Sequence, residues 1–406
     1  MPTPASRLPT PAPPVLIIVE NLPVPFDRRV WQEARALTEA GYRVSIICPK
    51  SRGFTKSREA LEGIEIYRHS LWEAAGPLGY VVEYAWALTA EFLLAVRVYA
   101  RTRFRILHAC NPPDTIFLIA LFFKLFGVRF IFDHHDLNPE LFEAKFGRRH
   151  RFFHRLLCLA ERFTFRTANV SIATNESYRE IAITRGRKKP ERVFIVRSSP
   201  DLTRIQPVPP RPELKQGRPF LVTYLGTMGP QEGVDLLIES AAHIVRQQNR
   251  HDVTFVMIGG GSEIPRLKAQ AAQRGIAPFV TFTGRISDEE LAAYLSTADV
   301  CAAPDPKNPM NDKSTMNKIL EYMAYARPVV LFDLTEGRRS AADAALYARP
   351  NDPIDFAAQI VTLLESEVLR RELGERGRKR IEEKLNWEVE RRALLAAHRA
   401  VMDRQL

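Results

Sequence analysis

Cysteine is scarce in this sequence, and its arrangement excludes two common structural roles. Four cysteines stand in 406 residues and none belongs to a Cys-x-x-Cys pair: Cys48, Cys110, Cys158 and Cys301. So sparse a set fits neither a disulfide framework nor a structural zinc site. The sequence therefore fits a reducing compartment.

A long uncharged apolar run is also missing. A membrane-spanning helix needs about 18 to 20 apolar residues in succession. The most apolar stretch, residues 116–132, is interrupted by Lys124 and Arg129. Residues 1–14 are rich in Pro, Thr and Ala and lack the apolar core of a signal peptide, so we expect a disordered leader. A soluble or peripheral protein is predicted.

Positive charge, by contrast, is in surplus. The formal net charge is +11, and the hydrophobic content of 46% is that of an ordinary globular protein. The surplus favours anionic partners such as nucleotide phosphates, acidic lipid head groups or nucleic acid, although a solvated basic surface explains it as well. A chain of 406 residues exceeds what one core usually serves, so two domains are expected.

Short apolar runs alternate with amphipathic segments along most of the chain. Residues 15–19 (VLIIV) predict a buried strand, residues 30–40 a helix that ends at Gly41, and residues 43–48 the next strand. This alternation is typical of a doubly wound α/β sheet, and it resumes at residue 220.

The predicted organisation is two Rossmann-like halves joined by a linker. The ranges are a leader at 1–14, an N-terminal domain at 15–200, a linker at 201–218, a C-terminal domain at 219–385 and a last helix at 386–406. The linker assignment rests on its Pro and charge content and its lack of apolar periodicity. The last helix is expected to pack back on the first domain, with a solvated helix as the alternative.

The segment NDKSTMNKILEYMAYARPVV carries the strongest candidate site. Ser314 or Thr315 is predicted to cap a helix on which Lys318 and Glu321, three residues apart, share one face. A helix N-terminus stabilises anions, and Lys318 adds a positive charge. Glu321 could accept hydrogen bonds from the vicinal hydroxyls of a ribose. A surface salt bridge between the two side chains is the alternative.

This segment resembles the donor-binding motif of the retaining, family-4-type GT-B glycosyltransferases, through the pattern E-Y-M-A-x-x-x-P-V-V. The resemblance implies a nucleoside-diphosphate sugar donor of UDP or GDP type, bound by Glu321 at its ribose, and two Rossmann-like domains facing a cleft. Residues 282–305 resemble the family segment whose turn holds the base, here Arg285 and Ile286, and residues 384–388 (KLNWE) resemble the family's tail.

The sequence departs from the family pattern at three positions. Lys313 replaces a usual Glu, and Thr227 and Glu232 stand where phosphate-binding Arg and Lys are common. Lys318 is therefore the candidate for the diphosphate. Backbone N–H groups in a glycine-rich loop are expected to assist, with a plain strand-to-helix turn as the alternative, and the glycines concerned are Gly226, Gly229 and Gly233.

In the first domain, His134, His135 and Asp136 follow a predicted strand and resemble the family's D-x-H-E/D-L motif. The resemblance places His135 against the donor sugar or acceptor, and a catalytic role is predicted for His135, Lys318 and Glu321. A metal site or a structural turn is the alternative for the three consecutive residues. No Asp-x-Asp triplet occurs, and no metal or other cofactor is expected.

Other loops are expected at the same sheet edge, because carboxyl ends of parallel strands meet there. We predict that they contact the acceptor or the donor phosphates. The acceptor-side candidates are Asp27, Arg28, Asn111, Asp114, His134 and Asp136.

Residues 148–166 (RRHRFFHRLLCLAERFTFR) mix Arg with Phe and Leu, as an interfacial amphipathic helix does. Residues 81–98 add further aromatic and apolar surface. A core helix with a solvated basic face is the alternative. No nucleic-acid motif accompanies the segment, so nucleic acid is not a predicted partner. With the family resemblance, the segment predicts a cytoplasmic enzyme, peripheral at the inner face of the plasma membrane.

The sequence thus predicts transfer of a sugar, with retention, to a lipid-linked or polysaccharide acceptor in cell-surface glycan biosynthesis. Two alternatives remain. One is a nucleotide-sugar epimerase or phosphorylase on the same fold, and the other is a peripheral membrane protein that binds nucleotide sugars without turnover. A dinucleotide-dependent dehydrogenase is disfavoured, because Ile264 stands where G-x-G-x-x-G needs its last glycine.

Overall fold

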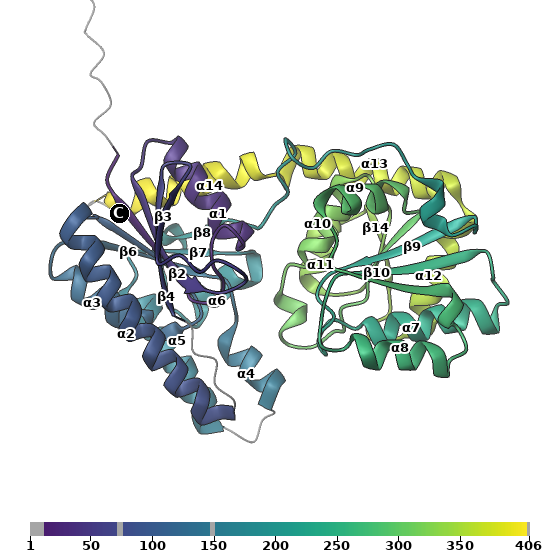
Figure 1. Cartoon of the computed structure of the whole chain (residues 1–406), viewed down its shortest axis with the longest axis horizontal. Coiled ribbons are helices and arrows are strands. Elements are labelled where there is room, and N and C mark those ends of the chain that lie inside the picture. The colour runs from purple at the N-terminus through teal and green to yellow at the C-terminus, as the bar shows by residue number, and fades with distance from the viewer. Residues whose placement is uncertain (1–11, 71–75, 147–150, 404–406) are drawn as a thin grey trace, which may run out of the picture. The chain divides into compact units, whose positions relative to one another are not determined.

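The computed structural model describes residues 12–70, 76–146 and 151–403, so most of the predicted leader lies outside it. Two compact units divide the chain (Figure 1). The N-terminal unit runs to Arg197 and also contains the chain from Glu390 onward, and the C-terminal unit is Ser198–Val389.

The N-terminal unit is built on an eight-stranded sheet in the order β3-β4-β2-β1-β5-β6-β7-β8. Its pairs are parallel except β3 with β4, which is antiparallel. The strands are β1 (Val15–Ile18), β2 (Val44–Lys50), β3 (Arg58–Leu61), β4 (Ile64–Ser70), β5 (Ile106–Cys110), β6 (Arg129–His134), β7 (Val170–Ala173) and β8 (Val193–Ile195).

Helices cover this sheet, and four of them (α2, α3, α5 and α6) share one hydrophobic core with its strands. The last helix of the chain, α14, belongs to the same unit, because His398 lies against the rings of Tyr42 and His108. The helices are α1 (Arg28–Glu39), α2 (Gly76–Thr102), α3 (Phe117–Lys124), α4 (Asn138–Phe146), α5 (Arg151–Thr167), α6 (Glu176–Thr184) and α14 (Trp387–Met402).

The C-terminal unit has a fully parallel six-stranded sheet in the order β11-β10-β9-β12-β13-β14. Its strands are β9 (Phe220–Leu225), β10 (Val253–Ile258), β11 (Val280–Gly284), β12 (Val300–Ala303), β13 (Val329–Phe332) and β14 (Ala345–Ala348). Its helices are α7 (Val234–Ala242), α8 (Ile264–Gln273), α9 (Asp288–Thr297), α10 (Asn317–Ala324), α11 (Thr335–Ala341), α12 (Pro353–Glu365) and α13 (Glu367–Lys384).

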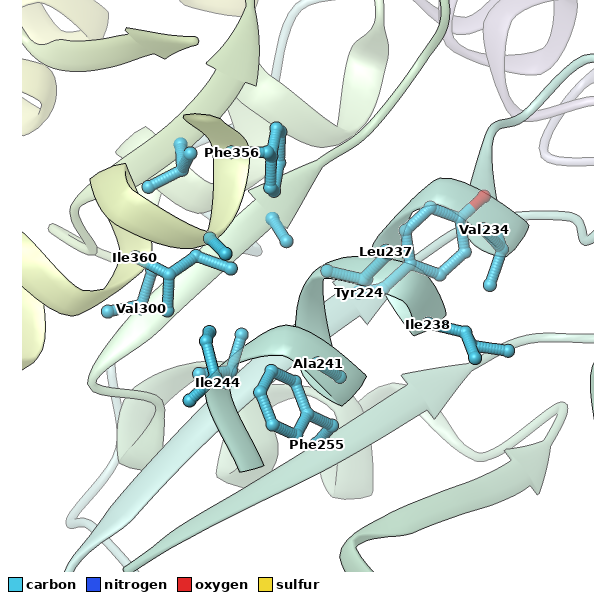
Figure 2. Packing of buried hydrophobic residues seen from close by; sticks show 14 of the residues in the cluster. Tyr224, Val234, Leu237, Ile238, Ala241, Ile244, Phe255, Val300, Phe356 and Ile360 are labelled. Carbon is cyan, nitrogen blue, oxygen red and sulfur yellow. The ribbon is translucent and has the colours of Figure 1, made fainter. Parts of the chain in front are cut away.

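Both faces of this second sheet are buried, which explains why its strands read as continuous apolar runs. On one face α7, α8 and α12 pack on the strands, and Figure 2 shows Phe255 and Tyr224 of the sheet among side chains from α7 and α12. On the other face α9, α10 and part of α13 form a separate core around Tyr322. Because both faces are covered, the ends of the strands are the part of the sheet that a ligand can reach.

The doubly wound architecture predicted from the alternation is confirmed, with strands close to their predicted places. Sequence analysis did not predict five short or irregular elements, namely β3, β14, α4, α6 and α11. The predicted last helix at 386–406 corresponds to α14, which follows α13 after a break around Asn386, whose side chain donates to Ile381 O and Glu382 O.

The Pro-rich segment 201–218 is tied to the C-terminal unit rather than a free linker. Val208 N donates to Ser296 Oγ at 2.9 Å, and Arg211 N donates to Thr297 Oγ1 at 2.8 Å. These hydrogen bonds fix the segment that was predicted as a linker along the end of α9, within the C-terminal unit. The boundary between the units lies at Arg197 and Ser198.

Candidate functional site

Each sheet has one place where the chain leaves in opposite directions from neighbouring strands. In the N-terminal unit this point lies between β1 and β5, and in the C-terminal unit between β9 and β12. Ligands of open α/β sheets bind outside the carboxyl ends of the strands at such switch points. The loops after these four strands are therefore the candidate sites.

The loop after β9 is held by close backbone contacts that only glycine allows. A Cβ on Gly233, which has φ of 68°, would lie 2.0 Å from Pro304 O after β12. A Cβ on Gly259 would lie 2.0 Å from Gly226 O. Gly226 N–H already donates to Ile258 O at 3.0 Å, so the expectation that this amide is open to a phosphate is wrong in this conformation.

Lys318, on the first turn of α10, cross-links both loops at this switch point. Its Nζ lies 2.7 Å from Asp305 Oδ1 and 3.1 Å from Glu232 Oε2, and 4.9 Å from the centre of the Tyr224 ring. Burial by itself would lower the pKa of Lys318, but the pull of Asp305, Tyr224 and Glu232 outweighs it and raises the pKa. The side chain is therefore a buried ammonium held by two carboxylates.

Asp305 is a site residue that sequence analysis did not select. It is 3% exposed, and its second oxygen, Oδ2, is buried without a hydrogen-bond partner among the residues that the structure describes. A buried unsatisfied carboxylate oxygen is costly, and a ligand hydroxyl or N–H at this position would remove that cost. Its position just after an apolar strand was the available signal, because that places it at the ligand edge.

Asn311, which precedes α10 in the chain, joins the same two loops. Its Nδ2 donates to Gln231 O at 3.0 Å and to Pro306 O at 2.9 Å. Ser314 does not cap α10 as predicted, because its Oγ donates to Met310 O and the N-cap, Met316, has no side-chain cap bond. The cap prediction is therefore wrong for Ser314.

The remaining donor-side candidates are spread along the same sheet edge. Glu321 is half-buried on α10, and Thr227 is exposed in the loop after β9. Ile286 packs beside Leu225 at the end of β9, and Arg285 next to it is exposed. Thr227, Arg285 and Ile286 thus follow the ends of β9 and β11, and Glu321 lies on α10. The predicted salt-bridge alternative for Lys318 does not describe a side chain so buried.

In the N-terminal unit a buried ionic cluster lies at the ends of β5 and β6. Arg29 Nη2 lies 3.1 Å from Asp133 Oδ1 and 3.0 Å from Glu33 Oε1, and Arg29 Nε donates to His135 Nε2 at 2.7 Å. His108 Nε2 lies 3.1 Å from Asp133 Oδ2. Asp133, Glu33 and His108 were not predicted as site residues, because each stands within an apolar segment of the sequence.

The charges of this cluster divide unequally between its two acids. Burial would raise the pKa of Asp133, but Arg29 and His135 outweigh burial and hold that pKa well below its usual range. Burial raises the pKa of Glu33 well above its ordinary value, against the pull of Arg29. Asp133 is thus the ionised acid of the cluster, with Oδ2 2.8 Å from Nε2 of His135, whose side chain is 15% exposed.

The acceptor-side candidates divide into supporting and surface residues. Asn111 Oδ1 accepts from His135 N at 2.6 Å, and its Nδ2 donates to Asp114 Oδ1 and to Asp136 O. Asn111 and Asp114 are buried and support the loop that carries His135 and the half-buried Asp136.

His134, Asp27 and Arg28 have different positions. His134 is 0% exposed, beside Phe165 and Tyr178, with Nε2 3.3 Å from Glu161, so its predicted contact with the acceptor is wrong in this conformation. Asp27 caps α1 by accepting from Val30 N, and Arg28 is exposed.

The alternative of a metal bound by three consecutive residues, His134 to Asp136, does not match the geometry. Within the described ranges, the groups that converge well enough to hold an ion are His108–Cys110–Asp133 and Glu33–Asp133–His135. Both depend on Asp133, which Arg29 already contacts through both oxygens. A guanidinium therefore supplies the positive charge at this position.

Two Rossmann-like units, each with a candidate site at the carboxyl edge of its sheet, define the GT-B class of glycosyltransferases. Two family models match the chain: "Glycosyl transferase 4-like domain" over residues 27–197 and "Glycosyl transferases group 1" over residues 219–366. Together they span more than half of the sequence. The chain belongs to the group 1 glycosyltransferases.

Relatives and solved structures agree with this assignment. The chain is 30% identical to D-inositol 3-phosphate glycosyltransferase of Geodermatophilus obscurus over 53% of this chain and 48% of the relative. It is 30% identical to phosphatidyl-myo-inositol mannosyltransferase of Mycobacterium leprae over 37% and 38%. The matched part is thus half or less of each relative's length.

The same architecture occurs in sucrose-phosphate synthase from Thermosynechococcus elongatus, with a TM-score of 0.79, 20% identity and coverage of 95% of this chain and 98% of that chain. HepE from Anabaena, in complex with UDP and glucose, has a TM-score of 0.71, 14% identity and coverage of 94% and 98%. At these identities the likeness establishes the fold.

Proposed function

We propose that this protein transfers a sugar from a nucleoside-diphosphate sugar to an acceptor. The observation that carries the proposal is the switch-point cluster of the C-terminal unit, where Lys318, Asp305 and Glu232 meet after β9 and β12. The complex of HepE with UDP and glucose, on the same fold, supports a nucleotide donor of UDP type, with GDP as the other base considered.

The donor is assigned to the edge formed by the ends of β9, β11 and β12. Glu321 takes the ribose, and Arg285 and Ile286 take the base, as the family resemblance implies. Asp305 Oδ2, which lacks a hydrogen-bond partner, accepts a hydroxyl or N–H of the donor. Because Lys318 is already neutralised by two carboxylates, it reaches the diphosphate only by exchanging Glu232, the more exposed partner.

Catalysis is proposed to depend on charge stabilisation at the leaving diphosphate. The reaction is proposed to retain configuration, as the family implies, and the leaving phosphate then accepts the proton of the acceptor hydroxyl. His135, fixed by Asp133 and by the Asn111 side chain beneath it, contacts the reacting sugar in this proposal. No metal ion has a role in it, since Arg29 occupies the position beside Asp133 that a cation would take.

The proposed acceptor is a lipid-linked or polysaccharide chain, and the protein is proposed to work in the cytoplasm at the inner face of the plasma membrane. Similarity to a phosphatidyl-myo-inositol mannosyltransferase supports a lipid acceptor. In the described part of the chain, no helix has the length and apolar content required to cross a bilayer. Docking is proposed to use a surface of the N-terminal unit.

That surface lies on three neighbouring helices of the N-terminal unit, α2, α3 and α5 (Figure 1). The rings of Phe92 and Phe122 join α2 to α3, and those of Phe117 and Phe163 join α3 to α5. Exposed apolar side chains gather there, and basic side chains on α5 flank them, as binding to anionic lipid requires. The exposed apolar residues are Val82, Trp86, Leu93, Val96, Leu118, Leu121, Phe122, Leu125, Phe126, Phe152, Leu156, Leu159 and Phe163.

Thermal-shift measurement against UDP-, GDP-, ADP- and dTDP-sugars tests the proposal. A donor that binds only the folded protein raises the melting temperature by mass action. We expect one nucleotide class to raise it, and Glu321→Ala to abolish the response while the surface variant Glu383→Ala keeps it. An unchanged response in Glu321→Ala would remove that residue from the donor site.

A transfer assay with the best donor separates the proposal from its two alternatives. Conversion of the donor without any acceptor would favour an epimerase or phosphorylase. Donor binding without transfer to any lipid or glycan acceptor would favour a non-catalytic nucleotide-sugar-binding protein. The departures at Thr227, Glu232 and Lys313 are what make the last comparison necessary.

A further inference from the structure

A basic cavity of about 600 Å³ opens in the N-terminal unit, away from the candidate sites. Its lining begins where β6, β7 and β8 start, at Arg129, Asn169 and Arg192. The candidate sites lie where parallel strands end. The two ends of β6 are about 16 Å apart, at about 3.3 Å per residue. The cavity is therefore a separate feature at the opposite edge of the sheet.

Eight cationic side chains and one carboxylate, Asp403, line this cavity. Within the described ranges none of the eight is ion-paired with an Asp or Glu. Elsewhere in the same unit, buried or half-buried arginines such as Arg29, Arg185 and Arg197 are each paired with two carboxylates. The cationic residues of the cavity are Lys124, Arg129, Arg162, Arg166, Arg187, Lys188, Lys189 and Arg192.

The loop that carries three of these cations is held rigidly in place. Gly186 is buried, and a Cβ there would lie 2.6 Å from both Ala182 O and the Phe165 ring. Arg187 adopts φ of 54°, and Lys188 N donates to Ala182 O at 2.9 Å. Since the backbone is fixed against α6, the like charges on this loop are presented together.

Two lysines that line the cavity have partly buried ammonium groups. Lys188 Nζ donates to Ala168 O at 2.6 Å, and Lys124 Nζ donates to Thr167 O at 2.5 Å. Burial, with Lys124 and Arg192 nearby, lowers the pKa of Lys188 to about 8. Among the described residues, no carboxylate pairs with these two lysines to offset the repulsion between the cations. A bound anion would offset it.

We propose that this cavity is a binding site for a phosphate-bearing anion, distinct from the site for the sugar donor. The volume suits a small molecule or a single head group. Guanidinium and ammonium groups bind phosphate oxygens by charge-assisted hydrogen bonds. The ligand is either a soluble polyphosphate or a lipid head group, because α3 and α5 line the cavity and also carry exposed apolar side chains.

The test compares binding of inorganic pyrophosphate, by calorimetry at low and high salt, in the full chain and in two double variants. Arg187→Gln with Lys189→Gln removes two exposed cavity charges with little risk to folding. Arg43→Gln with Lys384→Gln removes the same charge from exposed positions elsewhere. We expect about tenfold weaker binding in the cavity variant alone, or about 1.4 kcal/mol.

A second arm uses flotation with vesicles of phosphatidylcholine, with and without phosphatidic acid. Pyrophosphate binding that the cavity variant weakens assigns the site to a soluble ligand. Binding only to phosphatidic acid vesicles, weakened by the same variant, assigns it to a lipid head group. Binding should also take up a proton near pH 8, measurable from the buffer dependence of the enthalpy, because an anion raises the pKa of Lys188. Equal effects of the two variants, or no binding of either probe, would overturn the proposal.

Discussion

Lys318 joins the loops after β9 and β12 through one buried ammonium, so its removal should be costly. Lys318→Met leaves Asp305 buried at 3% exposure without its counter-charge, close to Glu232. Loss of one partner from a buried ion pair costs about 3–5 kcal/mol, and we expect about 3 because Glu232 is partly solvated. Urea unfolding measures the loss.

The control for this change is Lys268→Met, on the exposed face of α8, where the described part of the chain places no carboxylate partner. This change should alter stability by less than about 0.5 kcal/mol. Adding Asp305→Leu to Lys318→Met should restore part of the loss, since it removes the stranded charge. Equal stability of Lys318→Met and the wild type would show that the cross-link contributes nothing.

Two glycines of the same unit offer a matched pair. At Gly233 the backbone has φ of 68° and a Cβ would approach Pro304 O to 2.0 Å, whereas Gly260 has nothing within 4 Å of its Cβ position. Gly233→Ala should therefore cost about 2 kcal/mol or more and lower the thermal response to the donor, while Gly260→Ala should cost little. Unfolding and donor titration of both variants give the comparison.

At the scale of residues, the sequence predicts only contacts that are local. Lys318 and Glu321 are three residues apart, so their shared helix could be predicted. Asp305 and Glu232 lie 13 and 86 residues from Lys318, and only the sheet order brings them together. His134 and His135 are neighbours with the same side-chain chemistry. They differ in exposure, because His134 is fully buried whereas the side chain of His135 is 15% exposed.

At the scale of elements, α14 shows how a charged tail becomes part of a core. His398 is fully buried between the rings of Tyr42 and His108, with Nδ1 2.9 Å from Leu394 O. Glu390 at the other end of the helix accepts from Arg197 N at 2.9 Å. The helix was predictable from its pattern, but its partners were not, because Tyr42, His108 and Arg197 lie far from it in the sequence.

This packing predicts acid sensitivity of the N-terminal unit. Burial and His108 lower the pKa of His398 to about 3, whereas an unfolded histidine has a pKa of about 6.5. Between these values the unfolded chain binds more protons, so the free energy of unfolding falls as pH falls below 6.5. The loss from this group should reach about 2 kcal/mol at pH 5.

Urea unfolding across this pH range, in the wild type and two variants, measures the effect. His398→Gln should flatten the dependence between pH 5 and 7, because glutamine does not titrate there, whereas His251→Gln at an exposed position should leave it unchanged. A wild-type stability that stays constant over that range, or the same slope in His398→Gln, would contradict the assignment.

At the scale of the whole molecule, the alternation of strands and helices was enough to predict two doubly wound units and the sheet ends that carry the candidate sites. The assignment of segment 201–218 was not predictable, because its attachment is made by hydroxyls of Ser296 and Thr297 far along the chain. The proposed docking surface was predictable only in part. Residues 148–166 and 81–98 indicated α5 and α2, but the apolar side chains of α3 join them through tertiary packing.

The docking surface makes a prediction that depends on all three helices together. Leu93, Leu125 and Phe152 are 63%, 81% and 74% exposed, one on or beside each of α2, α3 and α5. Changing all three to Gln should barely affect folding, because exposed side chains contribute little to the core. In a lipid interface, burial of each apolar side chain contributes about 1 kcal/mol to the free energy of binding. We expect at least tenfold weaker flotation with anionic vesicles.

The matched control changes two exposed apolar residues of the C-terminal unit, Ile354→Gln with Val368→Gln, which are 58% and 57% exposed. General hydrophobic adhesion would be reduced by both sets of changes, whereas docking through α2, α3 and α5 is reduced by the first alone. Soluble pyrophosphate binding should survive the first set, since it removes no charge from the basic cavity. Equal flotation of the triple variant and the wild type would place membrane contact elsewhere or remove it from the mechanism.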